Sequence, residues 1–382
     1  MDLQFTQDQK MAQEMVRGFA EKEVKPVASE MDRRGQFPHE LVKKLADLGL
    51  MGAFMPPEYG GSGMDLVSYV LAMEEISKIW ASLGVMMTVN NSLVCEPIHR
   101  FGTEAQKQRY LVPLARGEKL GCYALTEPGA GSDAGSIKTR AQKEKGGYTL
   151  NGTKIFITNG KQADIAIVYA VTAPEHGKHG ISAFLVEKSM PGFVVGKLED
   201  KMGLRSSDTA ELIFQDCHVP AENLLGVENE GFKIALNTLD GGRIGIASQS
   251  LGIAQACLEE AIAYAKERHQ FGRPIGEFEA IRFMLADMAM EIQAARLLTY
   301  WAAQRRQEGQ RATLHAAQAK LLASEVANRV AYKAVQIFGG YGYIKEFPVE
   351  RYYRDARITT LYEGTSEIQR LVIARELLKQ QT

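Results

Sequence analysis

The sequence predicts an α+β protein in which a small β domain separates two helical domains. Apolar residues recur at helical spacing near both ends of the chain, at residues 281–295 and at Met11, Met15, Phe19 and Val24. In the middle of the chain the pattern changes to short runs rich in Ile, Val and Phe, which is typical of strands. This helix–strand–helix order, without alternating βαβ units, argues against a doubly wound nucleotide-binding fold.

The change of pattern divides the chain into three domains. Residues 1–118 form an N-terminal helical domain, residues 119–225 a middle β domain, and residues 226–382 a C-terminal helical bundle domain. In the β domain, residues 148–157 predict a hairpin with an Asn-Gly turn. In the last domain, the many alanines would let helices approach one another closely, as they do in a bundle.

Composition and charge narrow the classes of partner. A hydrophobic content of 45% with 24% charged residues is ordinary for a soluble globular protein. A formal net charge of −1 predicts no general attraction to nucleic acid or to anionic membranes. No apolar run in the sequence approaches the roughly 18 residues that a membrane-spanning helix needs. We therefore expect neither a nucleic-acid partner nor a membrane span.

Cysteine usage and the N-terminal segment predict the compartment. The four cysteines are scattered without CxxC spacing, which argues against a disulfide framework or a zinc site. We expect each to be a small buried side chain in a reducing cytoplasm, and we expect no metal. The first residues lack the basic and apolar regions of a signal peptide and the Arg/Ser bias of a transit peptide. The sequence thus predicts a cytoplasmic protein.

Residues 362–369, which read Tyr-Glu-Gly-Thr-Ser-Glu-Ile-Gln, are the most informative stretch of the chain. Neighbouring apolar residues such as Tyr362 would desolvate Glu363, and burial raises the pKa of a carboxyl toward the neutral value that a proton-abstracting base requires. Gly364 has no side chain, so a flat substrate could lie against the backbone and accept a hydrogen bond there. These residues predict a general base beside a substrate.

The same stretch also fits a helix start. Thr365 or Ser366 could be the N-cap, and Glu367 would then be a solvated acid in the first turn. These eight residues alone do not decide between the two interpretations, and the rest of the chain is needed.

Residues 123–133, which read Tyr-Ala-Leu-Thr-Glu-Pro-Gly-Ala-Gly-Ser-Asp, begin as a strand and end as a Gly-rich loop. Such a loop exposes backbone N–H groups and the hydroxyls of Thr126 and Ser132, which suit the edge of a flavin ring or a phosphate. The loop is not GxGxxG and follows a strand in a β segment rather than a βαβ unit. Taken alone, it also fits a cluster of β-turns.

This segment resembles the first signature of the acyl-CoA dehydrogenases. Residues 154–160 are similar to the strand that covers the flavin in that family, with Phe156 where many members have Trp. Further segments resemble family motifs, in family order and spacing: residues 268–272, 336–342, 354–357 and 362–365. The resemblance covers essentially the whole chain. It implies the family's fold, an N-terminal helical domain, a middle β-barrel-like domain and a C-terminal four-helix bundle, and it implies FAD.

The resemblance implies a mechanism as well. Glu363 would remove the pro-R α-proton of an acyl-CoA thioester while flavin N5 takes the β-hydride, giving the 2-enoyl-CoA. The thioester oxygen would lie between the N–H of Glu363 and a ribityl hydroxyl of FAD, an oxyanion hole that stabilises enolate character in the transition state. The family hands its electrons to electron-transferring flavoprotein and forms homotetramers, each a dimer of dimers.

Two groups of cofactor-binding residues are carried over from the family. One group would line the flavin and its pyrophosphate within a subunit: Leu125, Thr126, Ser132, Phe156 and Thr158. The other would reach the adenosine half of a neighbour's FAD: Arg268, Phe271, Gln336 and Gly340. The resemblance also implies cofactor contacts, in no particular subunit, for Tyr123, Gln270, Thr365 and Glu367. An arginine suits phosphate oxygens because its charge and its fork of donors match them. The alternatives are a solvated helix-face charge for Arg268 and plain strand packing for Phe156.

The substrate-binding residues follow from the same resemblance. Asp240 would bind the CoA moiety and Arg243 would lie near the catalytic carboxylate. The isovaleryl and long-chain enzymes have their base just before this Arg, where this chain has Gly242, so Glu363 is the only candidate left. The complete set is Ser132, Asp240, Arg243, Gln249, Thr359, Tyr362 and Gly364.

Residues 89–93 and 242–249 look most like the short-chain, or butyryl, branch of the family. Relatives in that branch narrow the acyl channel at the positions of Gln249 and Thr359. Residues 85–93 contain no Arg or Lys to bind the distal carboxylate of a dicarboxylic substrate. The alternatives are a branched, alicyclic or dicarboxylic acyl-CoA, an acyl-CoA oxidase, whose chains are usually much longer, and a DNA-associated relative, which would need a basic face.

Overall fold

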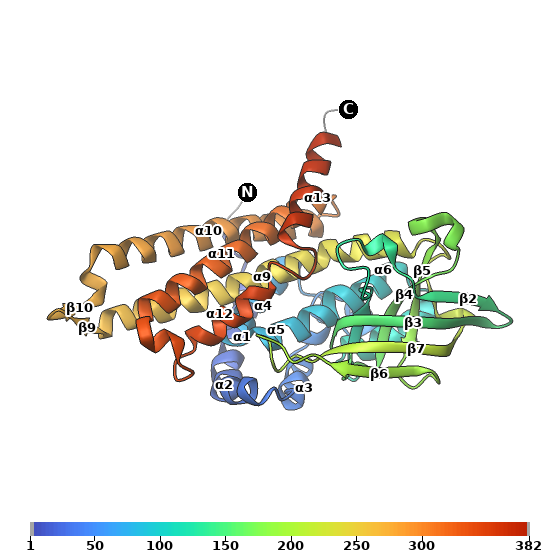
Figure 1. Cartoon of the computed structure of the whole chain (residues 1–382), viewed down its shortest axis with the longest axis horizontal. Helices are drawn as coiled ribbons and strands as arrows, with labels where there is room; N and C mark the ends of the chain where they lie inside the picture. Colours follow the sequence, from blue (N-terminus) through green and yellow to red (C-terminus); the bar gives the residue numbers. More distant parts are fainter. Residues whose placement is uncertain (1–3, 380–382) are drawn as a thin grey trace.

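A helical segment, a β sheet and a second helical segment follow one another in the computed structural model, which describes residues 4–379 (Figure 1). The sheet lies at one end of the long axis, and a small hairpin, β9 (His269–Gln270) and β10 (Arg273–Pro274), lies at the other (Figure 1). The predicted fold class is confirmed, while the domain boundaries stay predictions. No helix among the described residues is both long and apolar enough to cross a membrane.

Capping residues begin the N-terminal helices. Thr6 caps α1 and forms a capping box with Gln9, and Asp65 caps α4 by accepting from the N–H of Ser68. Gly35, at φ 61°, ends α2 in the left-handed conformation that glycine adopts without strain. The helices are α1 (Gln7–Phe19), η1 (Ala20–Val24), α2 (Lys25–Arg34), α3 (His39–Asp47), α4 (Leu66–Ile79), α5 (Ala81–Thr88), η4 (Val89–Cys95), α6 (Glu96–Phe101), α7 (Glu104–Gln106) and α8 (Val112–Ala115).

The helix predicted from the spacing of residues 11–24 is confirmed by α1 and η1, but its apolar residues do not share one buried face. Met11 and Met15 are exposed, whereas Val16 and Val24 are fully buried. The reason lies in the polar partners on α4, because Arg17 pairs with the buried carboxylate of Glu75 at 2.7 Å. A buried charge requires a partner, and Arg17 and Gln13 on the α4-facing side of α1 supply it, while Met11 and Met15 lie on the exposed side.

The strands of the middle segment form one sheet with mixed pairing, separate from the β9–β10 hairpin. Its order is β6-β7-β3-β2-β4-β5-β8, and β1 pairs in parallel with β4. The strands alternate Ile, Val, Phe and Ala on two buried faces, so the centre of the sheet is covered on both sides. The strands are β1 (Gly121–Ala124), β2 (Arg140–Glu144), β3 (Gly147–Thr158), β4 (Ile165–Val171), β5 (Ile181–Glu187), β6 (Phe193–Leu198), β7 (Thr209–Pro220) and β8 (Leu224–Leu225).

The hairpin predicted at the Asn-Gly dipeptide is wrong, because β3 runs through it without turning. Asn151 instead exchanges two hydrogen bonds with Asp216 across a bulge in β7. Gly152 serves close packing, since a Cβ there would lie 2.4 Å from the hydroxyl oxygen of Thr139. The chain turns earlier, between β2 and β3, where Gly146 has φ 92°. An Asn-Gly pair predicts a turn only where no neighbouring strand takes the backbone bonds of both residues.

Long helices pack side by side in the C-terminal domain (Figure 1). The predicted apolar stripe is confirmed in α10, where Met288, Ile292 and Ala295 are buried. Alanines line the facing sides of α9 and α11, and small side chains let these helices approach closely. The elements are α9 (Gly231–Glu267), α10 (Glu279–Gln307), α11 (Thr313–Phe338), η10 (Gly339–Tyr343), α12 (Val349–Ile358) and α13 (Ser366–Lys379).

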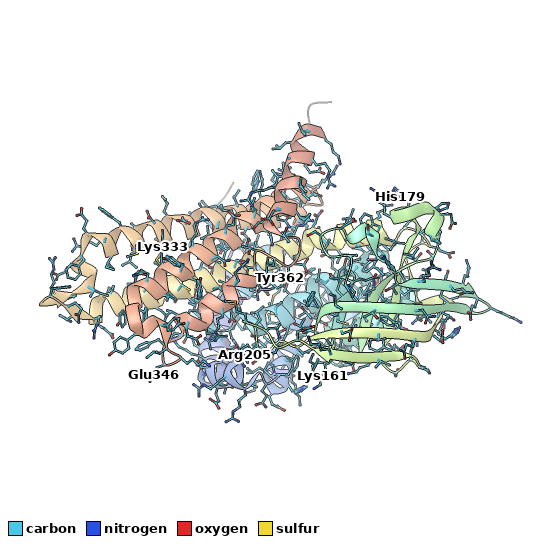
Figure 2. All side chains as sticks on the ribbon, viewed as in Figure 1. Lys161, His179, Arg205, Lys333, Glu346 and Tyr362 are labelled. Atoms are coloured by element: carbon cyan, nitrogen blue, oxygen red, sulfur yellow. The ribbon has the colours of Figure 1, made fainter. Side chains whose placement is uncertain are left out.

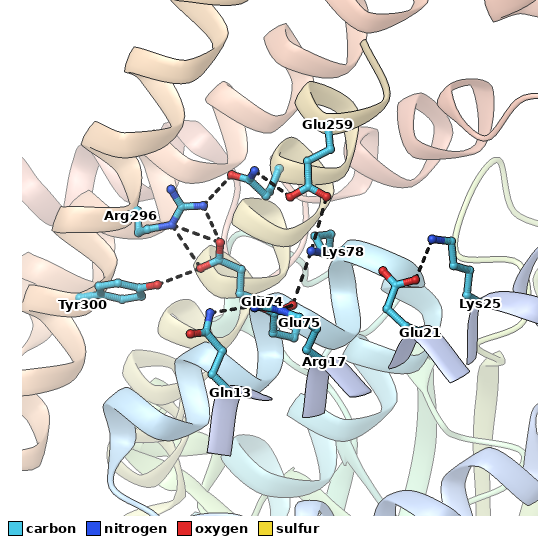
Figure 3. A network of polar contacts seen from close by, with 11 residues as sticks. Gln13, Arg17, Glu21, Lys25, Glu74, Glu75, Lys78, Glu259, Arg296 and Tyr300 are labelled. Atoms are coloured by element: carbon cyan, nitrogen blue, oxygen red, sulfur yellow. Dashed lines mark hydrogen bonds and ion pairs between the residues drawn. The ribbon is translucent and has the colours of Figure 1, made fainter. Parts of the chain in front are cut away.

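A network of polar contacts joins the two helical segments (Figure 3). Glu74 on α4 accepts from Arg296 at 2.5 Å and from the Tyr300 hydroxyl at 3.0 Å, both on α10. The neighbouring carboxylate of Glu75 is paired with Lys78, whose ammonium lies 3.6 Å from a Glu75 oxygen. The same ammonium lies 3.4 Å from a carboxylate oxygen of Glu259 on α9. Breaking a buried pair is costly, so α4 is held firmly against the bundle.

Candidate active site

The backbone bends sharply between α12 and α13, at Glu363 and Gly364. Both residues are left-handed, with φ 53° and φ 90°. Such a conformation costs a non-glycine residue about 1–3 kcal/mol and persists only where its surroundings hold it. Here the side-chain amide of Gln369 donates to both carbonyl oxygens at 2.9 Å, and Lys320 donates to the Gly364 oxygen at 2.7 Å. The strain at Glu363 indicates a constrained, functional position.

The Glu363 carboxyl lies in an unusual setting. Its Oε2 atom is buried and has no hydrogen-bond partner within residues 4–379, although the residue as a whole is only half-buried. It packs against α9, where a Cβ on Gly242 would lie 2.5 Å from Oε2. Burial raises the pKa of Glu363 to about 7, against the charges of Arg243 and Lys320, which lower it. The group can therefore accept a proton near neutral pH.

Arg243 and Asp240 form a buried pair on α9. The Arg243 guanidinium donates to one Asp240 oxygen at 2.8 Å, and the Thr313 hydroxyl donates to the other at 2.6 Å. Arg243 Nε is buried and has no partner in the described part of the chain. The Arg243 charge lowers the pKa of the Glu363 carboxyl, and the expected role of Arg243 beside the catalytic carboxylate stays a prediction. The expected contact of Asp240 with CoA stays a prediction, and its carboxylate is already engaged.

Tyr362, which is labelled near the middle of the molecule in Figure 2, contacts Gln249 of α9. The Tyr362 hydroxyl donates to the Gln249 side-chain oxygen, and the Gln249 amide donates to the Ala81 carbonyl at 2.8 Å. The oxygen and the nitrogen of the Gln249 amide therefore each have a hydrogen-bond partner within the protein. Thr359 is also buried, but its hydroxyl donates to the carbonyl of Ala356 at 2.7 Å, within its own turn.

Tyr123 joins the sheet to this cluster. It lies on β1, and burial raises the pKa of its hydroxyl, with Tyr169 and then Glu363 adding to the shift. Leu125 and Thr126 follow directly, and the Thr126 carbonyl accepts from the N–H of Ile155 at 2.9 Å. The first predicted cofactor loop therefore lies against β3 and follows the strand whose Tyr123 is affected by the Glu363 charge.

Phe156 stands out from β3 at a bulge beside this loop. Its φ is 57°, and two residues of β3 oppose one of β7 at this point. Phe156 is 61% exposed, so plain strand packing does not account for its position. A Cβ added to Gly129 or Gly131 would meet nothing within 4 Å, so open space borders the Gly-rich loop. A flat ring system fits beside this aromatic surface and these backbone groups, which is what FAD requires.

A buried ion pair holds the loop in place. The Lys154 ammonium donates to Glu127 at 2.7 Å and to the Leu125 carbonyl at 3.1 Å. Glu127 also accepts from the backbone N–H groups of Lys138 and Thr139. Burial lowers the pKa of Lys154 to about 8, although Glu127 opposes this shift. Ser132, farther along the loop, is exposed.

The remaining predicted residues fall into two places. Thr365 caps α13 by accepting from the N–H of Ile368 at 3.3 Å, so the helix start and the bend at Glu363 coexist. Glu367 is exposed in the first turn of α13. Thr158 ends β3, two residues beyond Phe156.

The second predicted cofactor group lies at the other end of the molecule. The Arg268 guanidinium lies over the Tyr341 ring, 5.4 Å from its centroid, which joins the β9–β10 hairpin to η10. Phe271 is 92% exposed, Gln270 and Gln336 are exposed, and a Cβ on Gly340 would meet nothing within 4 Å. Because the sheet lies at the opposite end of the long axis, one chain does not bring both groups together (Figure 1).

Comparison with known families decides what this arrangement belongs to. Models of the N-terminal, middle and C-terminal domains of acyl-CoA dehydrogenases match residues 6–118, 122–217 and 229–378. The chain belongs to the acyl-CoA dehydrogenase family. Members of this family are FAD flavoproteins, in agreement with the loop and the exposed ring described above.

Individual acyl-CoA dehydrogenases are similar over the whole length. The short-chain specific acyl-CoA dehydrogenase of Clostridium acetobutylicum is 52% identical, covering 99% of this chain and 100% of that protein. The structure of butyryl-CoA dehydrogenase from Megasphaera elsdenii has a TM-score of 0.98 at 52% identity, covering 99% of this chain and 100% of that one. A chain from a structural study of the electron-transferring flavoprotein of Acidaminococcus fermentans has a TM-score of 0.98 at 53% identity. The match covers 99% of this chain and 100% of that one.

Sequence reasoning missed two lysines in this acyl-CoA dehydrogenase. Lys154 holds the cofactor loop, and Lys320 holds the bend at Glu363. Both are fully buried. A signal existed for Lys320, which lies at helical spacing from Ala316, Ala317 and Ala323 on the apolar face of α11. Among residues 4–379 no group of His, Cys, Asp or Glu is placed to hold a metal ion.

Proposed function

We propose that this acyl-CoA dehydrogenase oxidises short-chain acyl-CoA thioesters to trans-2-enoyl-CoA, with Glu363 as the base. The observation that carries the proposal is the buried, unpartnered Oε2 of Glu363, on a strained bend and with its pKa raised to about 7 by burial. Such a carboxyl is ionised often enough at neutral pH to take a proton, and it is basic enough to hold one.

The chain's own residues orient and deprotonate the substrate. The α C–H bond breaks as its proton passes to a Glu363 carboxylate oxygen, and its electron pair forms the new double bond. The N–H of Glu363 would donate to the thioester oxygen and so stabilise charge that develops there. FAD, when bound, supplies the acceptor for the hydride lost from the β-carbon. Phe156 and the loop carrying Thr126 would hold the ring system, and Arg243 would keep positive charge near the carboxylate.

The short-chain assignment is supported by Gln249 and Tyr362 and by the relatives that are named short-chain specific. The Gln249 amide has two protein partners, so an acyl tail does not have to leave it unpaired. Discrimination must then come from bulk, because the Tyr362–Gln249 contact spans the space between the bend and α9. Each excluded methylene is worth only ~1–3 kcal/mol, so neighbouring chain lengths overlap.

Partners and compartment complete the proposal. Electrons would pass to electron-transferring flavoprotein, and the enzyme would work as a homotetramer in the cytoplasm. The similar chain from the Acidaminococcus fermentans study supports the first partner. The opposite positions of the two cofactor groups support assembly, because a neighbour must supply the second group (Figure 1). The four cysteines are buried and free, which suits a reducing compartment.

Anaerobic reduction of the FAD-loaded enzyme tests the base and the substrate class together. Butyryl-CoA should bleach the flavin of the wild type faster than hexanoyl-CoA does, and octanoyl-CoA should be slow. Glu363→Gln should keep its FAD yet lose ~10²–10⁴ of the rate, as expected for a missing general base. Glu40→Gln, an exposed carboxyl on α3, is the control. Bleaching of Glu363→Gln at the control rate would refute the base, and a best rate with octanoyl-CoA would refute the short-chain assignment.

A further inference from the structure

Lys320 lies at a site where a lysine is costly. It is fully buried on α11, with alanines at Ala316, Ala317 and Ala323. Its hydrogen bond, of 2.7 Å, goes to the Gly364 carbonyl and not to a carboxylate. Burial lowers the pKa of Lys320 to about 7, against the charge of Glu363, which raises it. A buried cation that contacts a single backbone oxygen does little for stability, so its position beside the bend needs another explanation.

Charged groups on several elements affect the pKa of Lys320. Glu363 on the bend, Glu367 at the start of α13 and Glu325 on α11 itself raise its pKa after burial has lowered it, and Arg243 on α9 lowers it further. Of the three carboxyls, Glu363 raises the pKa of Lys320 the most. In return, Lys320 and Arg243 are the cations that lower the pKa of the Glu363 carboxyl against its burial. Lys320 and Glu363 are therefore electrostatically linked in both directions.

We propose that Lys320 is a positioning residue for the proposed base: it anchors the Gly364 carbonyl and places a positive charge beside Glu363. The inference rests on the proposed role of Glu363. Gln369 also donates to the Gly364 oxygen, so the bend has a second anchor when Lys320 is replaced. The charge has no such substitute on α11. When the Lys320 charge is lost, the cation that still lowers the pKa of Glu363 is Arg243, which is already paired with Asp240.

The two contributions of Lys320 are separable by substitution. Lys320→Met removes the charge and the donor, Lys320→Gln keeps a donor without charge, and Lys320→Arg keeps both. Lys333→Met is the matched control. Lys333 lies on the same helix as Lys320, but it pairs with Asp287 and Glu291 on α10. All variants are prepared as FAD-loaded full chains. Lys320→Gln carries the test if Lys320→Met does not fold.

Two readouts follow each variant across pH. The first is the rate of anaerobic flavin bleaching by butyryl-CoA. The second is infrared titration of the Glu363 carboxyl without substrate, identified by its absence in Glu363→Gln. Removing a nearby cation raises a carboxyl pKa by about one unit or more. In Lys320→Met and Lys320→Gln, both curves should therefore move about one unit to higher pH, with about a tenfold rate loss below neutrality that alkali restores. Lys320→Arg and Lys333→Met should follow the wild type.

A uniform rate loss at every pH, with the infrared curve unmoved, would overturn the inference and leave Lys320 a structural residue. An equal shift in Lys333→Met would also overturn it, because the effect would then not be specific to Glu363. The infrared titration needs no turnover. If Glu363→Gln keeps full activity while the Lys320 variants still shift the carboxyl curve, the proposed base is wrong and the Lys320–Glu363 link stands.

Discussion

The Glu363 carboxyl is subject to opposing effects from residues that are far apart in the chain. Burial raises its pKa to about 7, while Arg243 of α9 and Lys320 of α11 pull it down. Its Oε2 atom occupies the space that a side chain at position 242 would need. Because the proposed base acts only when ionised, activity should rise with pH through about 7. A single methyl group at position 242 is therefore expected to act directly on the base.

Gly242→Ala is the corresponding prediction at the residue scale. The new methyl would lie 2.5 Å from Glu363 Oε2 and 2.8 Å from Leu93 Cδ2, so the carboxyl must move. A misplaced catalytic group costs up to ~10²-fold, so flavin bleaching by butyryl-CoA should fall by at least about tenfold. The control is Gly18→Ala on α1, where a Cβ meets nothing within 4 Å. That change should raise helix stability by ~1 kcal/mol without altering the rate. Unchanged bleaching in Gly242→Ala would contradict the packing described here.

At the scale of elements, the cofactor loop after β1 is held by β3. The Lys154–Glu127 pair is buried, and Ile155, the next residue of β3, binds the Thr126 carbonyl. The bulge that follows turns Phe156 outward. The loop and the exposed ring are thus parts of one rigid unit, which prepares the proposed FAD site before the cofactor binds.

Lys154→Met should break this unit. It leaves Glu127 buried with only backbone donors, and breaking a buried pair costs ~3–5 kcal/mol. We expect a lower urea midpoint for the apoprotein and weaker FAD binding by fluorescence titration. Lys143→Met removes a lysine from an exposed pair with Glu228, so it should change neither measurement. Equal effects of the two substitutions would show that the buried pair does not hold the loop.

At the scale of the whole molecule, the sheet and the β9–β10 hairpin lie at opposite ends of a long chain (Figure 1). The exposed Phe271 and the open space at Gly340 belong to the hairpin end, so they lie far from the Gly-rich loop of the same chain. A site that uses both ends must combine two chains, which accounts physically for the proposed homotetramer.

Subunit complementation tests this arrangement. Arg268→Ala should lose FAD, and Glu363→Gln should keep FAD but not react. When the two variants are co-expressed, a mixed dimer has one site with an intact Glu363 from one chain and an intact Arg268 from its neighbour. About a quarter of the sites should then be active for random pairing of subunits. Activity no higher than the mean of the separate variants would place both residues in the same chain's site.

Much of the fold and of the site could be predicted because the relevant signals are local. Helical and strand periodicity each depend on a few neighbouring residues, so the order of the three segments and the stripe ending at Ala295 are confirmed. The family motifs are also short segments, and they located the Glu363–Gly364 bend and the loop beside Phe156. An apolar flank next to a carboxylate predicts its burial from the sequence alone, and Glu363 Oε2 is buried.

Tertiary contacts decided the rest. The outward turn of Met11 depends on Glu75, the straight course of β3 through Gly152 depends on β7, and the satisfied amide of Gln249 depends on Tyr362. Lys320 shows the limit most clearly, because it is 43 residues away from Glu363 along the chain, by the difference of their numbers. The sequence determined which local structures form, since their energies arise among neighbours. Which buried polar groups meet depends on helix packing, and only the tertiary structure placed a lysine beside the carboxylate whose proton it influences.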